Sequence, residues 1–347
     1  MKKLTACAAI SMSLLLMAGC GKNAAGTTNT AANDTPGTQA MQADSKDTAD
    51  TAAPAGDEVI YIPVISKGFS QQFWQTVKMG ADQAAEELGV TIEFVGPESE
   101  TMVDKQVEML EAAMNKNPSA ICLAALDSKA MSHLLEKARD QNIPVIGFDS
   151  GIDSDIPVTT AATDNYAAAA HLAEQMGEAL GGSGKVAVIV TDQVTASSIG
   201  RRDGFVETLK EKYPDITVVD ILYGEGDPLK STDLVKACLQ AHADITGFVG
   251  LNEGSAVGVL NAVEELKKFD EVTIMGFDSG KQQIEAVRSG KMAGAITQNP
   301  IGIGYIAVES AVKAIKGETL AKTIDTGFYF YTKDNMDLGE IKPLLYD

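Results

Sequence analysis

The sequence predicts an α/β protein of two lobes, each a doubly wound parallel β-sheet covered by helices on both faces. From residue 58 onward, short apolar runs rich in Val, Ile and Ala alternate with segments whose apolar residues recur at helical spacing. Gly or Pro bounds most of these runs, as is typical of strands buried on both faces. The helical segments are too many for one doubly wound domain, and 347 residues suffice for two.

The periodicity assigns each element a range. The expected strands are residues 58–65, 91–95, 119–125, 144–148, 157–161, 185–190, 216–222, 247–250, 272–276 and 293–297. The expected helices are residues 72–88, 102–116, 129–141, 165–180, 198–212, 229–242, 254–268, 279–289 and 301–316. Because ligands of such sheets bind beyond the carboxyl ends of the strands, those ends are where we expect a site.

Composition and charge restrict the function. Hydrophobic residues make up 45% of the chain and aromatic residues 5%, and no apolar run reaches the length of a membrane span. Lys and Arg number 28 against 48 Asp and Glu, which gives a formal net charge of -20. This charge repels phosphate backbones and anionic lipids, so we expect a soluble body with no nucleic-acid partner.

The N-terminal segment has the layout of a secretion signal. Lys2 and Lys3 precede an apolar stretch over residues 4–17. Residues 16–20, Leu-Met-Ala-Gly-Cys, resemble a bacterial lipobox, whose cysteine receives diacylglycerol and becomes the mature N-terminus. This interpretation makes Cys20 the lipidation site and anchors the protein on the outer side of the bacterial cytoplasmic membrane, periplasmic or extracellular. Ordinary secretion with Cys20 as a free thiol is the alternative.

Residues 1–19 are therefore expected to be a signal peptide, and residues 20–57 a lipidated, disordered tether. The tether is mostly Ala, Thr, Asn, Asp and Gly, and so buries too little apolar surface to fold. Cys122 and Cys238 lie in apolar runs farther along the chain. We expect both to be small buried hydrophobic residues rather than disulfide partners or metal ligands.

Two strand ends carry nearly the same seven residues. Residues 145–151 read Val-Ile-Gly-Phe-Asp-Ser-Gly, and residues 274–280 read Ile-Met-Gly-Phe-Asp-Ser-Gly. Each half of the chain thus places one carboxylate, Asp149 or Asp278, at a strand end. Capping of the following turn or helix is the alternative role for each.

Other strand ends add polar groups that suit a ligand with many hydroxyls. They are Ser66-Lys67, Asn252-Glu253 and Gln298-Asn299. Carboxylates accept hydrogen bonds from hydroxyls, whereas amides, Lys and Arg donate to them. Trp74, the chain's only Trp, and Phe73 open the first helix and offer an apolar face to a sugar ring, although core packing is the alternative for both.

Over about residues 58–331 the sequence resembles the periplasmic sugar-binding proteins of ribose-binding type. These are solute receptors of ABC importers, and they share their type I periplasmic-binding fold with the effector domains of LacI-type repressors. The matching segments, in chain order, are Ser66 with Phe73-Trp74, residues 78–81, 147–149, 163–165, 201–205, 251–253, 276–278 and 296–298.

The resemblance implies a ligand site. It implies that sugar hydroxyls bond to Asp149, Arg201, Asn252, Asp278 and Gln298, with Phe73 or Trp74 stacked on the ring and Ser66 and Lys67 nearby. Arg201 is favoured over Arg202 because it stands four residues before Phe205, as in the family's Arg-x-x-Gly-Phe pattern. Ser150 and residues 67–72 depart from the ribose-binding pattern, so the identity of the sugar stays open.

The resemblance also implies a three-strand hinge, crossed near residues 161–164, 298–300 and 325–327. The N-terminal lobe would comprise residues 58–162 and 299–325, and the C-terminal lobe residues 163–298 and 326–347. The expected protein is a monomer without a cofactor. It closes on a monosaccharide and presents it to an ABC permease, with the ATPase on a separate chain.

Other functions fit less well. Residues 181–185, Gly-Gly-Ser-Gly-Lys, precede a strand and lack the Ser or Thr of a phosphate loop, and the three His residues lack metal-ligand spacing. A lipid-anchored glycosidase using Asp149 and Asp278 would need a general acid, and we expect carboxylates surrounded by donors to stay ionised. A LacI-type repressor would need a basic headpiece before residue 58. A nucleoside or furanosyl signal as ligand, or a sensor receptor as partner, stays open.

Overall fold

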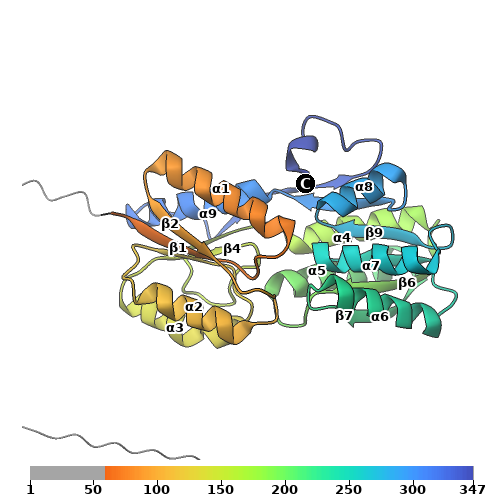
Figure 1. Cartoon of the computed structure of the whole chain (residues 1–347), viewed down its shortest axis with the longest axis horizontal. Coiled ribbons are helices and arrows are strands. Elements are labelled where there is room, and N and C mark those ends of the chain that lie inside the picture. Colours follow the sequence, from red (N-terminus) through yellow and green to blue (C-terminus); the bar gives the residue numbers. More distant parts are fainter. Residues whose placement is uncertain (1–58, 347) are drawn as a thin grey trace, which may run out of the picture. The chain divides into compact units, whose positions relative to one another are not determined.

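The computed structural model describes residues 59–346, which lie in one compact unit, Gly56–Asp347. Within these residues the chain forms two six-stranded sheets with helices on both faces (Figure 1). The predicted α/β fold with two mostly parallel sheets is thereby confirmed. The predicted signal peptide, Cys20 and the tether lie outside the described residues.

The first sheet is entirely parallel, and we call it and its helices the first lobe. Its strand order is β11-β5-β4-β3-β1-β2. Helices α1 and α9 share one hydrophobic core with the sheet, and α2 and α3 share another. The elements are β1 (Tyr61–Ile65), α1 (Gln72–Leu88), β2 (Thr91–Val95), α2 (Val103–Met114), β3 (Ile121–Leu123), α3 (Ser128–Asp140), β4 (Val145–Phe148), β5 (Thr159–Ala162), α9 (Pro300–Ile315) and β11 (Thr323–Asp325).

The second sheet and its helices form the second lobe, with strand order β12-β10-β9-β8-β6-β7. Helices α4 and α5 pack with one core cluster, and α6, α7 and α8 with another. The elements are α4 (Asn165–Ala179), β6 (Ser183–Val190), α5 (Ala196–Lys212), β7 (Asp215–Tyr223), α6 (Pro228–Ala241), β8 (Gly247–Gly250), α7 (Glu253–Leu266), β9 (Thr273–Phe277), α8 (Lys281–Ser289), β10 (Gly294–Gln298), β12 (Phe328–Tyr331) and the 3-10 turn η1 (Lys342–Leu344).

The chain passes between the two sheets three times. It crosses between β5 and α4, between β10 and α9, and between β11 and β12. Strands β11 and β12 were not predicted, because each is a short edge strand whose place is set by pairing with β5 or β10. Strand β12 is antiparallel to β10, since it follows β11 directly without a crossover helix.

Close helix packing holds α1 against α9 in the first lobe. A Cβ atom at Gly80 would lie 2.0 Å from the Ile301 carbonyl oxygen, and one at Gly304 would lie 1.9 Å from that of Val77. Only glycine at these positions lets α1 and α9 approach so closely. The position of α1 along α9 is fixed as a result.

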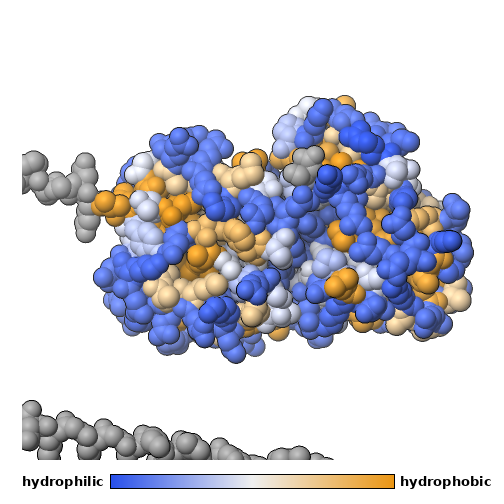
Figure 2. Space-filling model, in the orientation of Figure 1, coloured by the Kyte–Doolittle hydropathy of each residue, from blue (hydrophilic) through white to orange (hydrophobic). Residues whose placement is uncertain are grey.

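The two buried cysteines are as predicted. Cys122 and Cys238 are free thiols in the cores of the two lobes. None of the helices within residues 59–346 is long and apolar enough to cross a membrane. Hydrophilic residues cover most of the face shown in Figure 2, in keeping with the net charge of -20.

A buried glutamine ties together the strand ends that lead into the junction. Gln106 Nε2 donates to the carbonyl oxygens of Ser66, at 2.9 Å, and Ala124, at 2.8 Å. Its Oε1 accepts from the amide of Leu126 at 2.9 Å. The side chain is fully buried, so water cannot replace these bonds.

We expect Gln106→Leu to lower the free energy of unfolding by about 2–4 kcal/mol, because it leaves three buried main-chain groups without partners. Urea unfolding measures the loss. The control is Gln83→Leu on the exposed side of α1, where the amide contacts only Glu87. Equal losses in the two variants would contradict this role for Gln106.

Candidate functional site

Polar side chains from both lobes surround one small cavity at the carboxyl ends of the strands. The cavity is about 20 Å³, which is room for roughly one water molecule. Its lining residues are Lys67, Gln71, Phe73, Trp74, Glu100, Asp149, Thr191, Ser197, Ser198, Arg201, Asn252, Asp278 and Gln298. A sugar-sized ligand could enter only if these side chains or the lobes moved apart.

The two repeated aspartates occupy equivalent strand ends. Asp149 follows β4 and Asp278 follows β9, and both are almost fully buried. Both have left-handed backbone conformations, with φ of 58° and 79°. The amide of Asp149 donates to the Ala161 carbonyl at 2.9 Å, and that of Asp278 to the Ile296 carbonyl at 2.6 Å. Pairing with the neighbouring strand thus holds each residue in a conformation that costs free energy, which is typical of functional positions.

Both oxygens of Asp278 accept hydrogen bonds from N–H groups. Gln298 Nε2 donates to Oδ1 at 2.7 Å, and the Glu253 amide donates to Oδ2 at 2.9 Å. Thr163 Oγ1 in turn donates to Gln298 Oε1 at 2.9 Å and fixes the amide orientation. Burial raises the pKa of Asp278, although Arg201 and Gln298 oppose the shift. From the sequence we expected the surrounding donors to keep this carboxylate ionised, and that expectation did not consider the effect of burial. The two N–H groups that donate to its oxygens still fit the ionised form.

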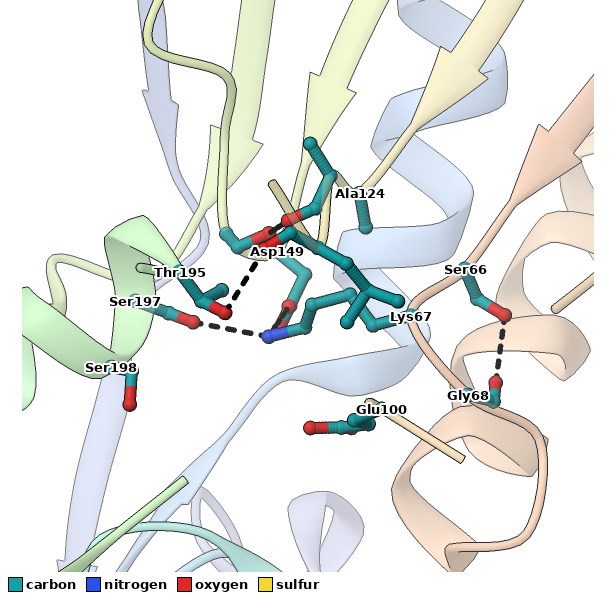
Figure 3. A network of polar contacts seen from close by, with 12 residues as sticks. Ser66, Lys67, Gly68, Glu100, Ala124, Asp149, Thr195, Ser197 and Ser198 are labelled. Atoms are coloured by element: carbon teal, nitrogen blue, oxygen red, sulfur yellow. Dashed lines mark hydrogen bonds and ion pairs between the residues drawn. The ribbon is translucent and has the colours of Figure 1, made fainter. Parts of the chain in front are cut away.

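Lys67 joins the two lobes at the centre of the cavity (Figure 3). Its Nζ lies 3.0 Å from Asp149 Oδ2 and donates to Ser197 Oγ of the second lobe at 3.1 Å. The Asp149 contact is an ion pair without hydrogen-bond geometry, which leaves this carboxylate oxygen free to accept. Burial acts to lower the pKa of Lys67, but the carboxylates of Asp149 and Glu100 outweigh it and raise that pKa.

Arg201 is the other buried cation of the cavity. Its guanidinium lies 3.8 Å from the centroid of the Phe277 ring. Nε donates to Asn165 Oδ1 at 2.7 Å, and Nη1 donates to the Leu251 carbonyl at 3.0 Å. Arg202, the neighbouring candidate, does not line the cavity and pairs with Asp203.

Asn252 and Ser66 are held by local hydrogen bonds. Asn252 is the N-cap of α7, and its Oδ1 accepts from the Ser255 amide at 2.9 Å. Its amide nitrogen stays available to donate into the cavity, which the residue lines. Ser66 Oγ donates to the Gly68 carbonyl at 2.7 Å, and Ser66 is not among the lining residues.

The aromatic wall is built around Trp74. Its ring packs edge-on against Phe73, with centroids 5.0 Å apart, and against Phe148, with centroids 6.4 Å apart. Its Nε1 donates to Glu100 Oε1 at 2.8 Å. Both Phe73 and Trp74 line the cavity while also packing into the core of the first lobe.

Five lining residues were not among the sequence candidates: Gln71, Glu100, Thr191, Ser197 and Ser198. Because ligands bind beyond the carboxyl ends of the strands, the sequence could have indicated Thr191, which follows β6, and the two serines at the start of α5. Glu100 lies in the loop after β2 and has no local pattern to identify it. Burial raises the pKa of Glu100, while Lys67 and the Trp74 N–H oppose the shift.

A larger hollow, of about 750 Å³, lies along the outer side of α7 and α8. Its charged side chains, those of Glu264, Lys281, Glu285 and Lys291, are all exposed, so it lacks the buried polar groups that fix a small ligand. Residues 59–346 hold no cluster of His, Cys, Asp or Glu suited to a metal ion.

Two α/β lobes with a polar cavity between their strand ends define a two-lobed binding protein. The family described as "Periplasmic binding protein domain" matches residues 61–319. The chain belongs to this family.

Curated relatives share the same region. The D-allose-binding periplasmic protein of Escherichia coli is 30% identical over 261 residues, which cover 73% of this chain and 84% of the relative. The ribose import binding protein of Bacillus subtilis is 25% identical over 252 residues, covering 73% and 80%.

Solved structures agree in fold. An ABC transporter solute-binding protein from Agrobacterium vitis with bound D-fucose has a TM-score of 0.80 and 33% identity, and covers 82% of this chain and 100% of its own. A carbohydrate transporter solute-binding protein from Agrobacterium radiobacter, in complex with D-arabinose, has a TM-score of 0.79 and 31% identity, covering 83% and 99%.

The Glu100 carboxylate beside Trp74 should be visible in tryptophan fluorescence, because Trp74 is the only Trp in the chain. We expect a change of emission on acidification with a midpoint above the ordinary pKa of 4.5, since burial raises the pKa of Glu100. Glu100→Gln should abolish this change, whereas Glu98→Gln, on the exposed part of the same loop, should keep it. An unaltered transition in Glu100→Gln would contradict the assignment.

Proposed function

We propose that the chain is the solute-binding protein of an ABC importer, which captures a monosaccharide between its lobes and presents it to a membrane permease. The observation that carries this proposal is the single cavity in which buried carboxylates, two cations, amides and a Trp ring converge from both lobes. A ring with many hydroxyls needs donors and acceptors together with an apolar face, and this set supplies all three.

Each candidate residue has a role in this proposal. Asp149 and Asp278 accept from sugar hydroxyls, and Arg201, Asn252 and Gln298 donate to ring or hydroxyl oxygens. Trp74, with Phe73, packs on the C–H face of the ring. Lys67 gives up its hydrogen bond to Ser197 and donates to the ligand instead. Ser66 does not contact the ligand, but its hydrogen bond to the Gly68 carbonyl holds the loop that carries Lys67.

The relatives support a sugar as ligand. The two curated relatives described above are binding proteins for allose and ribose, and the two solved structures hold D-fucose and D-arabinose. Such a receptor hands its ligand on unchanged, so the site needs no general acid, and neither oxygen of Asp278 is placed to supply one. In this proposal the ATPase is a separate chain, and the protein acts as a monomer.

Ligand entry in this proposal requires the lobes to separate, because the cavity in the present conformation is about 20 Å³. We assign residues 58–162 and 299–325 to one moving body and residues 163–298 and 326–347 to the other. The three crossings between the sheets serve as the hinge. Closure on the ligand is then what the permease reads.

The proposal is tested by thermal unfolding of the purified protein with pentoses, hexoses, polyols, nucleosides and amino acids. A ligand at a hundredfold its Kd adds about 2.7 kcal/mol, which should raise Tm by several degrees. A shift with one or two monosaccharides supports the proposal and names the sugar. A shift with nucleosides or amino acids alone would overturn the sugar assignment.

Binding measurements on variants with the sugar found in this panel locate the site. Asp149→Ala, Asp278→Ala and Arg201→Ala should each weaken binding of that sugar at least a hundredfold, because each leaves buried polar partners of the ligand unpaired. Asp153→Ala, an exposed aspartate close to Asp149 in sequence, is the matched control and should bind normally. Unchanged affinity in all three cavity variants would place the site elsewhere.

We also propose that Cys20 carries a lipid that holds the protein on the outer side of the cytoplasmic membrane. The lipobox-like residues 16–20 support this proposal. In bacterial cells, Cys20→Ala should abolish incorporation of a clickable fatty acid and should release the protein into the soluble fraction. A Cys7→Ala variant, altered within the expected signal peptide, should stay labelled. Equal labelling of Cys20→Ala would contradict lipidation at this residue.

A further inference from the structure

Two helices at the junction of the lobes lack N-caps of their own. Helix α1 follows Gln71, whose side chain accepts no hydrogen bond from the helix. Helix α8 follows Gly280, which has no side chain to accept one. The first amides of a helix have no partner within it, so buried ones need an acceptor from elsewhere.

The missing acceptors come from the opposite lobe. Glu253, the first residue of α7, accepts from the Gln72 amide through Oε1 at 3.2 Å and from the Phe73 amide through Oε2 at 3.0 Å. In return, Gln72 Oε1 accepts from the Lys281 amide at the start of α8, at 2.8 Å. Each lobe therefore caps a helix of the other.

The packing around these contacts is tight. A Cβ atom at Gly280 would lie 3.0 Å from Gln72 Oε1 and 3.2 Å from Glu253 Oε1. The absence of a side chain at Gly280 thus lets both acceptors approach α8. Glu253 is only 8% exposed, so water cannot easily take the place of its partners.

Neither Glu253 nor Gln72 lines the cavity, yet each is bonded to residues that do. Gln72 precedes Phe73, and Glu253 follows Asn252 in the chain. The amide of Glu253 also donates to Asp278 Oδ2. The caps therefore fix the two lobes relative to each other beside the cavity, although neither Glu253 nor Gln72 lines it.

We propose that Glu253 and Gln72 form a reciprocal capping latch, which sets how strongly the closed form is favoured and hence how slowly a ligand leaves. The inference rests on the proposed function, because it requires a ligand that closes the lobes. Opening would break three hydrogen bonds, two of which join the first amides of α1 to the side-chain oxygens of Glu253. A ligand that binds the closed form is held more tightly when these hydrogen bonds make the closed form more favourable.

The latch should depend on pH. Burial raises the pKa of Glu253 to about 7, the Phe73 and Gln72 amides oppose this, and the nearby carboxylates of Asp278 and Glu100 add to it. The buried hydroxyls of Tyr331 and Tyr346 also lie near the carboxylates of Asp278 and Glu253.

In the open form Glu253 meets water and regains an ordinary pKa near 4.5, so closure takes up a proton between about pH 4.5 and 7. The contribution of Glu253 to affinity is therefore greatest at low pH and falls as pH rises through 7. Asp278 and Glu100 also make the affinity fall as the pH rises, because burial raises the pKa of each.

Two variants test the latch from its two sides. Glu253→Leu removes both side-chain oxygens and leaves the amides of Gln72 and Phe73 without an acceptor, and Gln72→Leu removes the acceptor for α8. Matched controls are Glu264→Leu, at an exposed position of the same helix α7 that pairs with Lys291, and Gln83→Leu on the exposed side of α1. Thermal unfolding without ligand checks that every variant folds.

The measurements are stopped-flow dissociation of the sugar found in the thermal panel and small-angle X-ray scattering of the ligand-free protein. We expect each latch variant to release the sugar about tenfold to a hundredfold faster and to scatter as a more open particle. The controls should match the unaltered protein. The affinity of Glu253→Leu should also fall less steeply than that of the unaltered protein as the pH rises from 5 to 8, because the titrating carboxyl is gone.

Failure of the latch and failure of the proposed function give different results. Unchanged release, scattering and pH slope in both variants, with sugar still bound, would overturn the latch and leave the function in place. If no monosaccharide binds the unaltered protein, the proposed function fails, and ligand-free scattering decides the latch alone. More open particles in both variants would then support it, and identical curves would overturn it.

Discussion

Two aspartates, Asp149 and Asp278, are buried at strand ends in strained backbone conformations, and the rest of the cleft compensates the cost of burying them. Burial of an unpaired carboxylate is unfavourable by several kcal/mol or more, so each needs a cation or N–H donors nearby. Asp149 has Lys67, and Asp278 has Gln298, the Glu253 amide and the field of Arg201. Because these partners come from both ends of the chain, the charges can be satisfied only in the folded arrangement.

The same requirement explains why polar side chains line the cavity and apolar side chains pack around them on the side away from it. The aromatic rings of Phe73, Trp74 and Phe148 pack into the first core, and Phe277 supports Arg201 from the second. Rigid packing behind the polar groups holds them in position when their partners change. A hydroxylated ring can therefore replace contacts such as Lys67 with Ser197 without rebuilding the walls.

Much of the fold followed from local pattern. Alternating apolar runs and amphipathic segments predicted the strands from β1 to β10 and the helices from α1 to α9 to within a few residues. Strands β11 and β12 escaped prediction because their residues are partly exposed and their pairing partners lie far along the chain. The repeated Gly-Phe-Asp-Ser-Gly segments identified Asp149 and Asp278 in the same way, since a strand end followed by a tight turn is a local feature.

The sequence by itself determined the fold class, the strand-end aspartates and the two buried cysteines, because periodicity, turn residues and apolar runs act over a few neighbouring positions. Only the tertiary structure decided that Glu100 contacts Trp74, that Lys67 reaches Ser197, and that Glu253 and Gln72 cap helices of opposite lobes. These contacts join residues 26 to 209 positions apart. Their partners are chosen by how the two sheets meet, which no local pattern encodes.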